Sequence, residues 1–479
     1  MTVRSKEKKN TSIVVKSSLA YTVCNIIKNS LSFITLPLFT RLLTTTQYGQ
    51  VTIYSSWMGI LQIFLTLQLA YGSFSTAMVK FENDRDGYIS AVEGITLFLS
   101  GIFIVIYIPF HSVFNKIFEL PTWLMIIMIV EITVTNAFTM WTGKKRFEYK
   151  YKSVVAVTLL VSFIAPIVAY FLVINTSNKG YARIIGYSAI NIIVGTILFV
   201  QQGIKGKNLF SKKYWRYAFS FNIPLLAYYL SQTIFNQSDR IMISHMIGTD
   251  KAAVYGVAYN LAMVLTFVLN AINGAYVPWY YEKIKNNDLK ANRQVSLAIA
   301  LIIAILVSAV IWFAPEIIFI MAGEKYADAV YIVPPVAISL LLLFFSQLSI
   351  NVEFYFEEKG GLVYASIGAA LFNIIANYIF IKMYGYIAAG YTTLVSYLIF
   401  AYANYRVARR VMNEKALTND GVDIKAMVTL FGIFSLTSLV AAILYPHMIV
   451  RIGVVILLFS FVFYKRNHFI DLFKRLKSV

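Results

Sequence analysis

Lys28 lies in the middle of the first long apolar segment, in the sequence CNIIKNSLSF. Asn25, Asn29 and Ser32 share its neighbourhood at helical spacing, so a polar stripe on one helix face is predicted. A charge within a bilayer costs about 2.5 to 3.5 kcal/mol on insertion scales. We therefore expect Lys28 to bind a phosphate or carboxylate, or else to pair with an acidic residue that holds the fold together.

Glu131 is the second charge near the centre of an apolar segment, followed by Thr133, Thr135 and Asn136. A carboxylate in this position could accept hydrogen bonds from a substrate, relay protons or pair with Lys28. The sequence does not separate these three roles, and all of them make Glu131 a candidate for the lining of a polar cleft.

Three further candidates lie at or near the ends of apolar segments. Asp239 and Arg240 are adjacent, so on a helix they point about 100° apart, and we expect one to face a cleft while the other pairs with a neighbour. Arg41 ends the first apolar segment. A guanidinium there could grip a diphosphate through two hydrogen bonds, or anchor the segment at the interface.

Signatures of catalysis or cofactor binding are not found in the sequence. It has no G-x-x-x-x-G-K-[ST] phosphate loop, and Gly203–Lys207 (GIKGK) lacks the required spacing. The one cysteine, Cys24, excludes a disulfide within the chain, and the histidines do not occur at metal-ligand spacing. We predict a protein that is not an enzyme and that has no cofactor and no metal site.

The elements that must position these charges are membrane helices. Of 479 residues, 59% are hydrophobic and 13% charged, and the mean hydropathy is +0.69, far from the composition of soluble domains. Apolar runs long enough to cross a ~30 Å hydrocarbon core recur along the chain, about fourteen in number. The predicted spans are 17–38, 49–71, 89–110, 121–141, 153–174, 184–200, 217–247, 253–277, 295–321, 330–352, 362–382, 386–405, 426–445 and 448–464.

The net charge of +20 does not indicate a nucleic-acid partner. Lys and Arg are concentrated in alternate short connections between the apolar runs, and such an excess marks the cytoplasmic side. Both chain termini are therefore predicted to be cytoplasmic.

A short internal repeat predicts two lobes. Tyr48-Gly49 and Tyr255-Gly256 each stand near the start of a span, six spans apart, and a second tyrosine follows each pair. Repeats with an even number of spans are parallel and enclose a central cleft. We expect an all-α membrane protein with an N-lobe (1–202), a basic cytoplasmic linker (203–216), a C-lobe (217–408) and a final helical pair with a tail (409–479).

Three segments resemble the Wzx-type polysaccharide-unit flippases of the multidrug/oligosaccharidyl-lipid/polysaccharide exporter superfamily. They are SLSFITLPLFTRLLTTTQYGQVTIYSS (Ser30–Ser56), QSDRIMISHMIGTDKAAVYGVAYNLA (Gln237–Ala262) and LFNIIANYIFIKMYGYIAAGYTTLVSYLIFAY (Leu371–Tyr402). The resemblance implies a two-lobe bundle in the bacterial cytoplasmic membrane. It also implies transfer of an undecaprenyl-diphosphate-linked oligosaccharide to the outer leaflet by alternating access, for capsule, O-antigen or related polysaccharides.

The expected partners are this lipid-linked oligosaccharide, membrane lipids and other polysaccharide-assembly proteins. By the same resemblance, the last two spans would form a groove for the lipid tail. A multidrug antiporter of the same superfamily is the first alternative, although carboxylates are scarce within the spans. A membrane glycan polymerase is disfavoured because the predicted outer connections are short, and a scaffold would make the buried charges dispensable.

Overall fold

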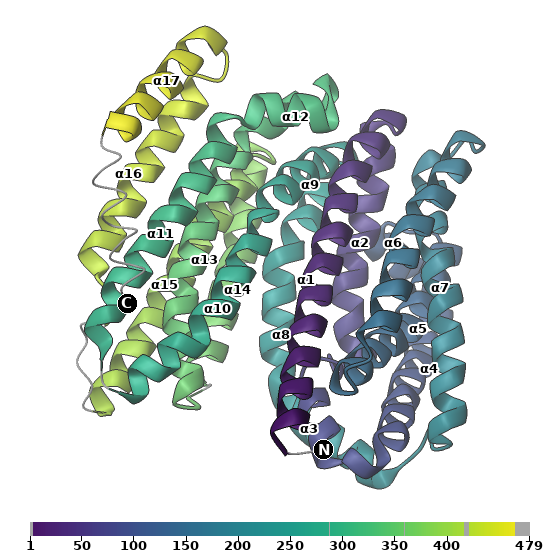
Figure 1. The fold of residues 1–479 in the computed structure, drawn as a ribbon. Coiled ribbons are helices and arrows are strands. Elements are labelled where there is room, and N and C mark those ends of the chain that lie inside the picture. Colours follow the sequence, from purple (N-terminus) through teal and green to yellow (C-terminus); the bar gives the residue numbers. More distant parts are fainter. Residues whose placement is uncertain (1–2, 287, 359, 416–420, 465–479) are drawn as a thin grey trace. The chain divides into compact units, whose positions relative to one another are not determined.

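The computed structural model describes residues 3–286, 288–358, 360–415 and 421–464, and its described secondary structure is helical (Figure 1). The chain divides into two compact units, Met1–Gln237 and Ser238–Val479. The boundary falls inside one long helix, α8, which contributes residues to both units.

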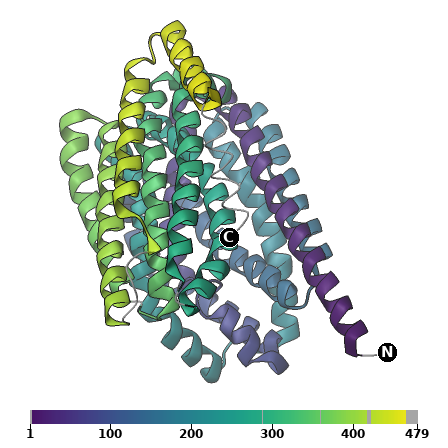
Figure 2. The same cartoon turned by 60° about the vertical axis from the view of Figure 1, so that its left-hand side comes forward.

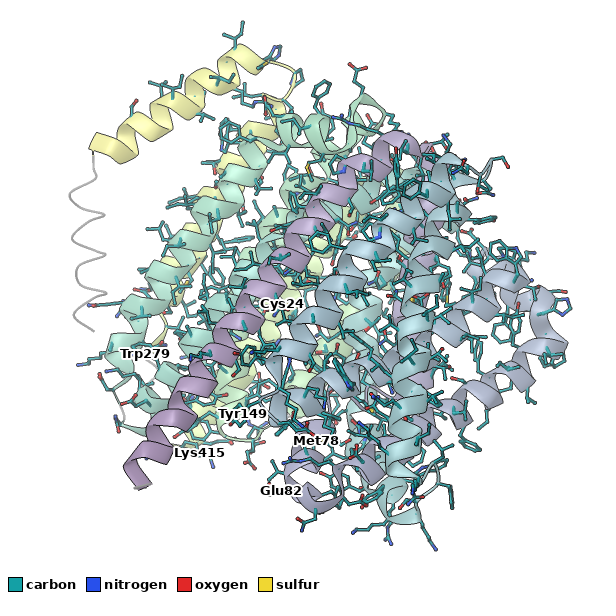
Figure 3. The ribbon with its side chains drawn as sticks, turned by 45° about the vertical axis from the view of Figure 1, so that its right-hand side comes forward. Cys24, Met78, Glu82, Tyr149, Trp279 and Lys415 are labelled. Atoms are coloured by element: carbon teal, nitrogen blue, oxygen red, sulfur yellow. The ribbon has the colours of Figure 1, made fainter. Side chains whose placement is uncertain are left out.

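Unit 1 is built from long helices joined by short turns. Its helices are α1 (Val3–Leu42), α2 (Thr45–Thr66), α3 (Phe74–Lys80), α4 (Arg85–Phe118), α5 (Thr122–Phe147), α6 (Tyr151–Ile174), α7 (Lys179–Gly206) and the first part of α8 (Lys212–Met246), with a 3₁₀ turn at Glu82–Asp84. Helix α1 packs along α6, as two views show (Figures 1 and 2). The buried Cys24 lies about midway along α1 (Figure 3).

Unit 2 repeats this style of construction. Its helices are the last turns of α8, α9 (Thr249–Met263), α10 (Leu265–Lys285), α11 (Leu289–Trp312), α12 (Ala314–Ala322), α13 (Val333–Tyr355), α14 (Gly360–Tyr384), α15 (Ala388–Glu414), α16 (Ile424–Ile443) and α17 (Met448–Tyr464), with a 3₁₀ segment at Glu324–Tyr331. Helix α15 packs between α13 and α14, and α16 packs along α11.

Ten helical segments of the described ranges are long and apolar enough to cross a membrane. They coincide with ten of the predicted spans, and the chain is a multi-pass membrane protein. Helices α2, α8, α15 and α17 correspond to the other four predicted spans but fall outside this set. The count of fourteen therefore remains a prediction.

Two predicted spans differ from the observed helices. The segment 295–321 is two helices, because Pro315 has no N–H to continue the α11 ladder and instead stands in the first turn of α12. The segment 253–277 is interrupted at Val264, between α9 and α10. The short helix α3 was not expected, since seven residues give too little periodic signal.

Local sequence signals fix several helix ends. Thr44 and Gln47 form a capping box at the start of α2, with bonds of 3.2 Å and 3.1 Å between side chain and backbone. Leu67, in the left-handed conformation, ends the same helix. At the start of α7, Asn178 accepts a hydrogen bond from the Tyr181 N–H at 3.2 Å.

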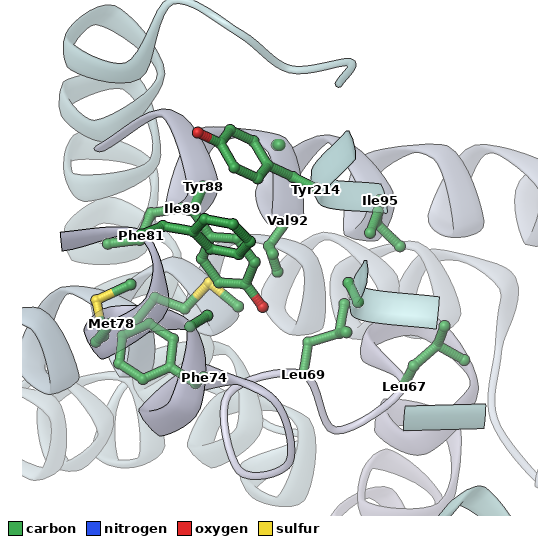
Figure 4. Close-up of a cluster of buried hydrophobic side chains, with 14 residues drawn as sticks. Leu67, Leu69, Phe74, Met78, Phe81, Tyr88, Ile89, Val92, Ile95 and Tyr214 are labelled. Atoms are coloured by element: carbon green, nitrogen blue, oxygen red, sulfur yellow. The ribbon is translucent and has the colours of Figure 1, made fainter. Parts of the chain in front are cut away.

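An aromatic cluster joins α3, α4 and the start of α8 in unit 1 (Figure 4). The ring of Phe81 stacks on Tyr88 at 5.5 Å between centroids and meets Tyr214 edge-on at 4.9 Å. Tyr88 and Met78 are completely buried. Such ring pairs add to the apolar burial, so this cluster ties the end of α2 to the start of α8.

The connection between α7 and α8 packs directly against α4. The Trp215 indole N–H donates to the Ala91 carbonyl at 2.9 Å. A Cβ added to Gly94 would lie 1.7 Å from the Leu209 carbonyl oxygen. Glycine is needed here because the two backbones are in contact.

In unit 2, a partly buried ion pair attaches α17 to α12. Arg451 is 2% exposed, and its guanidinium donates to the Glu316 carboxylate. The hydroxyl of Tyr445, in the turn before α17, donates to the Ile311 carbonyl at 2.9 Å. The charge that interrupts the last apolar segment therefore has a structural partner.

Candidate functional site

A polar cavity of about 380 Å³ lies among α1, α2, α5, α6 and α7 of unit 1. Helical spacing brings its lining residues to common faces: Lys28, Leu31 and Thr35 on α1, and Glu131 and Thr135 on α5. Hydroxyl, amide and aromatic side chains complete the wall, including those of Gln62, Phe138, Thr139, Thr158, Ser162, Tyr187 and Asn191.

Glu131 is the most deeply held polar group of this cavity, at 3% exposure. Its carboxylate accepts hydrogen bonds from the Tyr54 hydroxyl at 3.0 Å, the Ser188 hydroxyl at 2.5 Å and the Asn191 amide at 2.8 Å. These donors come from α2 and α7, and all three are neutral. Hydrogen bonds of this kind stabilise a carboxylate without cancelling its charge.

Lys28 lines the same cavity as Glu131, from α1. Of the described lining residues, these two carry formal charge at neutral pH. The cavity therefore presents one ammonium and one carboxylate among many hydroxyl and amide groups, a lining suited to a polyhydroxylated ligand that also carries negative charge.

The other sequence-predicted site residues lie elsewhere. Arg41 is in the last turn of α1 and its side chain is exposed. Asp239 and Arg240 lie near the end of α8, within unit 2. The structure thus brings Lys28 and Glu131 to one cavity, and Asp239 and Arg240 to another part of the chain.

Asp239 is the centre of a buried polar network in unit 2. Its carboxylate, 1% exposed, accepts hydrogen bonds from the Tyr255 hydroxyl at 2.5 Å, the Asn377 amide at 2.5 Å and the Thr393 hydroxyl at 2.7 Å. Asn373 extends the network, because its oxygen accepts from Asn377 at 3.1 Å. These groups join α8, α9, α14 and α15 and leave the carboxylate surrounded by oxygen and amide groups.

Arg240 turns away from this network, as the 100° separation of neighbouring helix positions requires. Its guanidinium carbon lies 4.3 Å from the centre of the Tyr259 ring. Both Asp239 and Arg240 are buried. The Arg240 charge is held by a cation–π contact.

Several residues of these two sites were not singled out from sequence. Ser188 and Asn191 stand three positions apart on α7, and Asn373 and Asn377 four apart on α14. Polar residues at i, i+3 or i+4 in an otherwise apolar helix are the signal that could have found them. Tyr54, the third donor to the carboxylate in the cavity of unit 1, comes from another helix, α2.

The fold agrees with that of solved transporters. The lipid II flippase MurJ, in an inward closed conformation, matches with a TM-score of 0.66 at 16% identity, over 94% of this chain and all of that one. An inward-facing MATE family transporter of the MOP superfamily matches with a TM-score of 0.62 at 15% identity, over 81% of this chain and 96% of that one. The chain therefore has the fold of these solved membrane transporters.

The sequence defines the family more narrowly. The family model described as "Polysaccharide biosynthesis protein" matches residues 14–283, more than half of the chain, and a second model, MatE, matches residues 224–379. The chain belongs to the polysaccharide biosynthesis protein family.

Two curated proteins of Haemophilus influenzae are similar over most of their length. "Lsg locus putative protein 1" is 23% identical over 368 residues, covering 72% of this chain and 86% of that protein. An "Uncharacterized membrane protein" is 21% identical over 378 residues, covering 74% of this chain and 87% of that protein.

Proposed function

We propose that this protein is a flippase that moves an undecaprenyl-diphosphate-linked oligosaccharide across the bacterial cytoplasmic membrane for surface polysaccharide synthesis. The observation that carries the proposal is the cavity of unit 1, where Lys28 and Glu131 stand among hydroxyl and amide groups inside an apolar bundle. Membership of the polysaccharide biosynthesis protein family and the MurJ-like fold support a lipid-linked substrate.

A polar cavity lowers the barrier that such a substrate would meet in bare hydrocarbon. Sugar hydroxyls and phosphates cannot be solvated by lipid chains, and moving them there costs several kcal/mol for each group. In our proposal the sugars enter the cavity while the lipid tail stays in the bilayer. Glu131 accepts hydrogen bonds from sugar hydroxyls, and Asn191 exchanges hydrogen bonds with them. Lys28 attracts the diphosphate.

Arg41 and Lys28 would contact the diphosphate at different points of its path across the membrane. Both are on α1, and thirteen residues separate them, which is about 20 Å along a helix. One diphosphate cannot contact both at the same time. We therefore assign Arg41 and Lys28 to different stages of transfer. Asp239 and Arg240, which lie in unit 2, are candidates for coupling or for substrate contact.

The direct test replaces Lys28 with Ala in a strain that lacks its flippase. We expect loss of surface polysaccharide at unchanged protein abundance, and partial recovery with Lys28→Arg. Lys16→Ala is the matched control, because Lys16 is exposed on the same helix and does not line the cavity. Full polysaccharide production by Lys28→Ala would reject the assignment.

The multidrug antiporter is the second candidate, favoured by the MatE match over residues 224–379. An antiporter would lower the accumulation of cationic dyes in cells, and a flippase would not. Orientation is tested separately with reporters fused near Gly206 and Asp288, which we expect to lie in the cytoplasm.

A further inference from the structure

A second cavity, of about 360 Å³, lies within unit 2 among α10, α13, α15 and α16. Its wall is apolar over most of its length, with Leu342, Phe345, Leu398, Val428 and Phe431 as examples. Its lining includes none of the residues of the Asp239 network. Helix α16, one of the two spans expected to form a groove for the lipid tail, supplies part of this wall, whereas the residues assigned to the sugars and the diphosphate do not.

The length of this cavity is comparable to the depth of one leaflet of a bilayer. On α15 its lining extends from Leu398 to Met412, and on α13 from Leu342 to Val352. At 1.5 Å per residue these stretches are about 21 Å and about 15 Å long, and half of a hydrocarbon core is about 15 Å. One end lies at mid-helix and the other where α15 ends and α16 begins, the predicted cytoplasmic side.

Arg409 supplies a cation at that end of the cavity, and its side chain is exposed. The neighbouring charges have partners: Arg410 donates to Glu414 at 2.7 Å, and Arg406 donates to the Tyr402 hydroxyl at 2.8 Å. Within the part of the chain that the structure describes, Arg409 has no ion pair. Its charge is therefore available to a ligand.

Within residues 421–464, the acidic group nearest in sequence to the cavity wall is already engaged. Asp423 caps α16 by accepting from the Ala426 N–H at 3.0 Å, and it also accepts from the Arg293 guanidinium. The Gly421 carbonyl accepts from the Asn292 amide at 2.6 Å. Arg409 is the one charged residue among the described lining residues of this cavity.

We propose that this cavity binds one acyl chain of an anionic phospholipid from the predicted cytoplasmic leaflet, with the phosphate on Arg409. The apolar wall covers the chain over the depth of one leaflet, and the guanidinium binds the phosphate through hydrogen bonds. The site shares no lining residue with the cavity of unit 1, to which the sugars and the diphosphate are assigned.

The test uses the purified full-length chain, stripped of lipid and offered phosphatidylglycerol or phosphatidylcholine with identical acyl chains. We expect native mass spectrometry to show one retained phosphatidylglycerol, preferred roughly fivefold, the effect of one Arg near an anionic headgroup. Arg409→Gln should abolish this preference. Arg410→Gln, the matched control, should keep it, because Arg410 does not line the cavity.

A second variant tests the chain rather than the headgroup. Ala401→Phe places a ring in the cavity and should lower retention of both lipids. Arg409→Gln should lower retention of phosphatidylglycerol alone. Equal preference in Arg409→Gln and the unmodified chain would overturn the proposal, as would displacement of phosphatidylglycerol by an equal amount of undecaprenyl phosphate. Polysaccharide complementation reports on the flippase proposal independently.

Discussion

The hydroxyl of Tyr54 on α2 donates a hydrogen bond of 3.0 Å to the carboxylate of Glu131 on α5. Both side chains are buried, and the Glu131 carboxylate lines the cavity of unit 1. The bond fixes the orientation of the Glu131 carboxylate, which is the one negatively charged group among the described lining residues. The placement of the carboxylate thus depends on a residue 77 positions earlier in the chain.

Tyr54→Phe should therefore disturb the cavity without changing its charge. The variant removes one of three donors to Glu131, and we expect a loss of stability of about 1 kcal/mol, typical of interhelical hydrogen bonds in membranes. Glu131→Gln should reduce polysaccharide export more than Tyr54→Phe does, because the new amide NH₂ group would face the three donors that now bind the carboxylate. Thermal unfolding in detergent and complementation measure the two effects, and normal export by Glu131→Gln would contradict the site.

The Asp239 network predicts a graded series in unit 2. Thr393→Val removes one donor to Asp239 and should destabilise the protein by about 1 kcal/mol. Asp239→Asn should cost more, since its new N–H groups would face hydroxyl and amide donors. Thr437→Val is the control, because the Thr437 hydroxyl bonds only to its own helix at Phe434. Equal melting temperatures for all three variants would refute the series.

Glu148, just after α5, predicts a pH dependence. Burial raises the pKa of its carboxyl, but the hydrogen bond from Lys150 and the charges of Lys144 and Lys145 outweigh this and lower the pKa to about 2. The folded pKa is below the ordinary value of 4.5, so the stabilisation is present above about pH 4.5 and is lost as the pH falls towards 2.

Glu148→Gln should accordingly lower the melting temperature near neutral pH and have little effect near pH 2. A pH series of melting temperatures measures this. Glu414→Gln, which alters the exposed pair with Arg410, should give a much smaller difference at neutral pH. A constant difference between Glu148→Gln and the unmodified chain at all pH values would contradict the assignment.

Gly94 predicts a strong steric effect within α4. Gly94→Ala places a methyl group against the Leu209 carbonyl, and overpacking of this kind typically costs 1 to 3 kcal/mol. Gly101→Ala is the control on the same helix, because nothing lies within 4 Å of its Cβ position. We expect Gly101→Ala to be neutral or slightly stabilising, and equal melting temperatures of the two variants would be inconsistent with the close packing.

Sequence predicted the helical membrane fold because hydropathy and length act locally along the chain. It also singled out Lys28 and Glu131, because a charged residue within an apolar run can be recognised without knowledge of the fold. The three donors around Glu131 were not predicted, since Tyr54, Ser188 and Asn191 meet it only through tertiary packing. Likewise, two of the three partners of Asp239, Asn377 and Thr393, come from helices more than a hundred residues away.

The contact between Gly94 and Leu209 has a practical consequence for dissection of the chain. Residues 203–216 were expected to be a linker, and linkers are the usual places to cut a protein in two. Here Trp215 and Leu209 pack against α4, so a cut in that segment would deprive the N-terminal fragment of these contacts. A cut after α8 would in turn separate Asp239 from its partners Tyr255, Asn377 and Thr393, so a cut at either end of α8 breaks contacts within one of the two units.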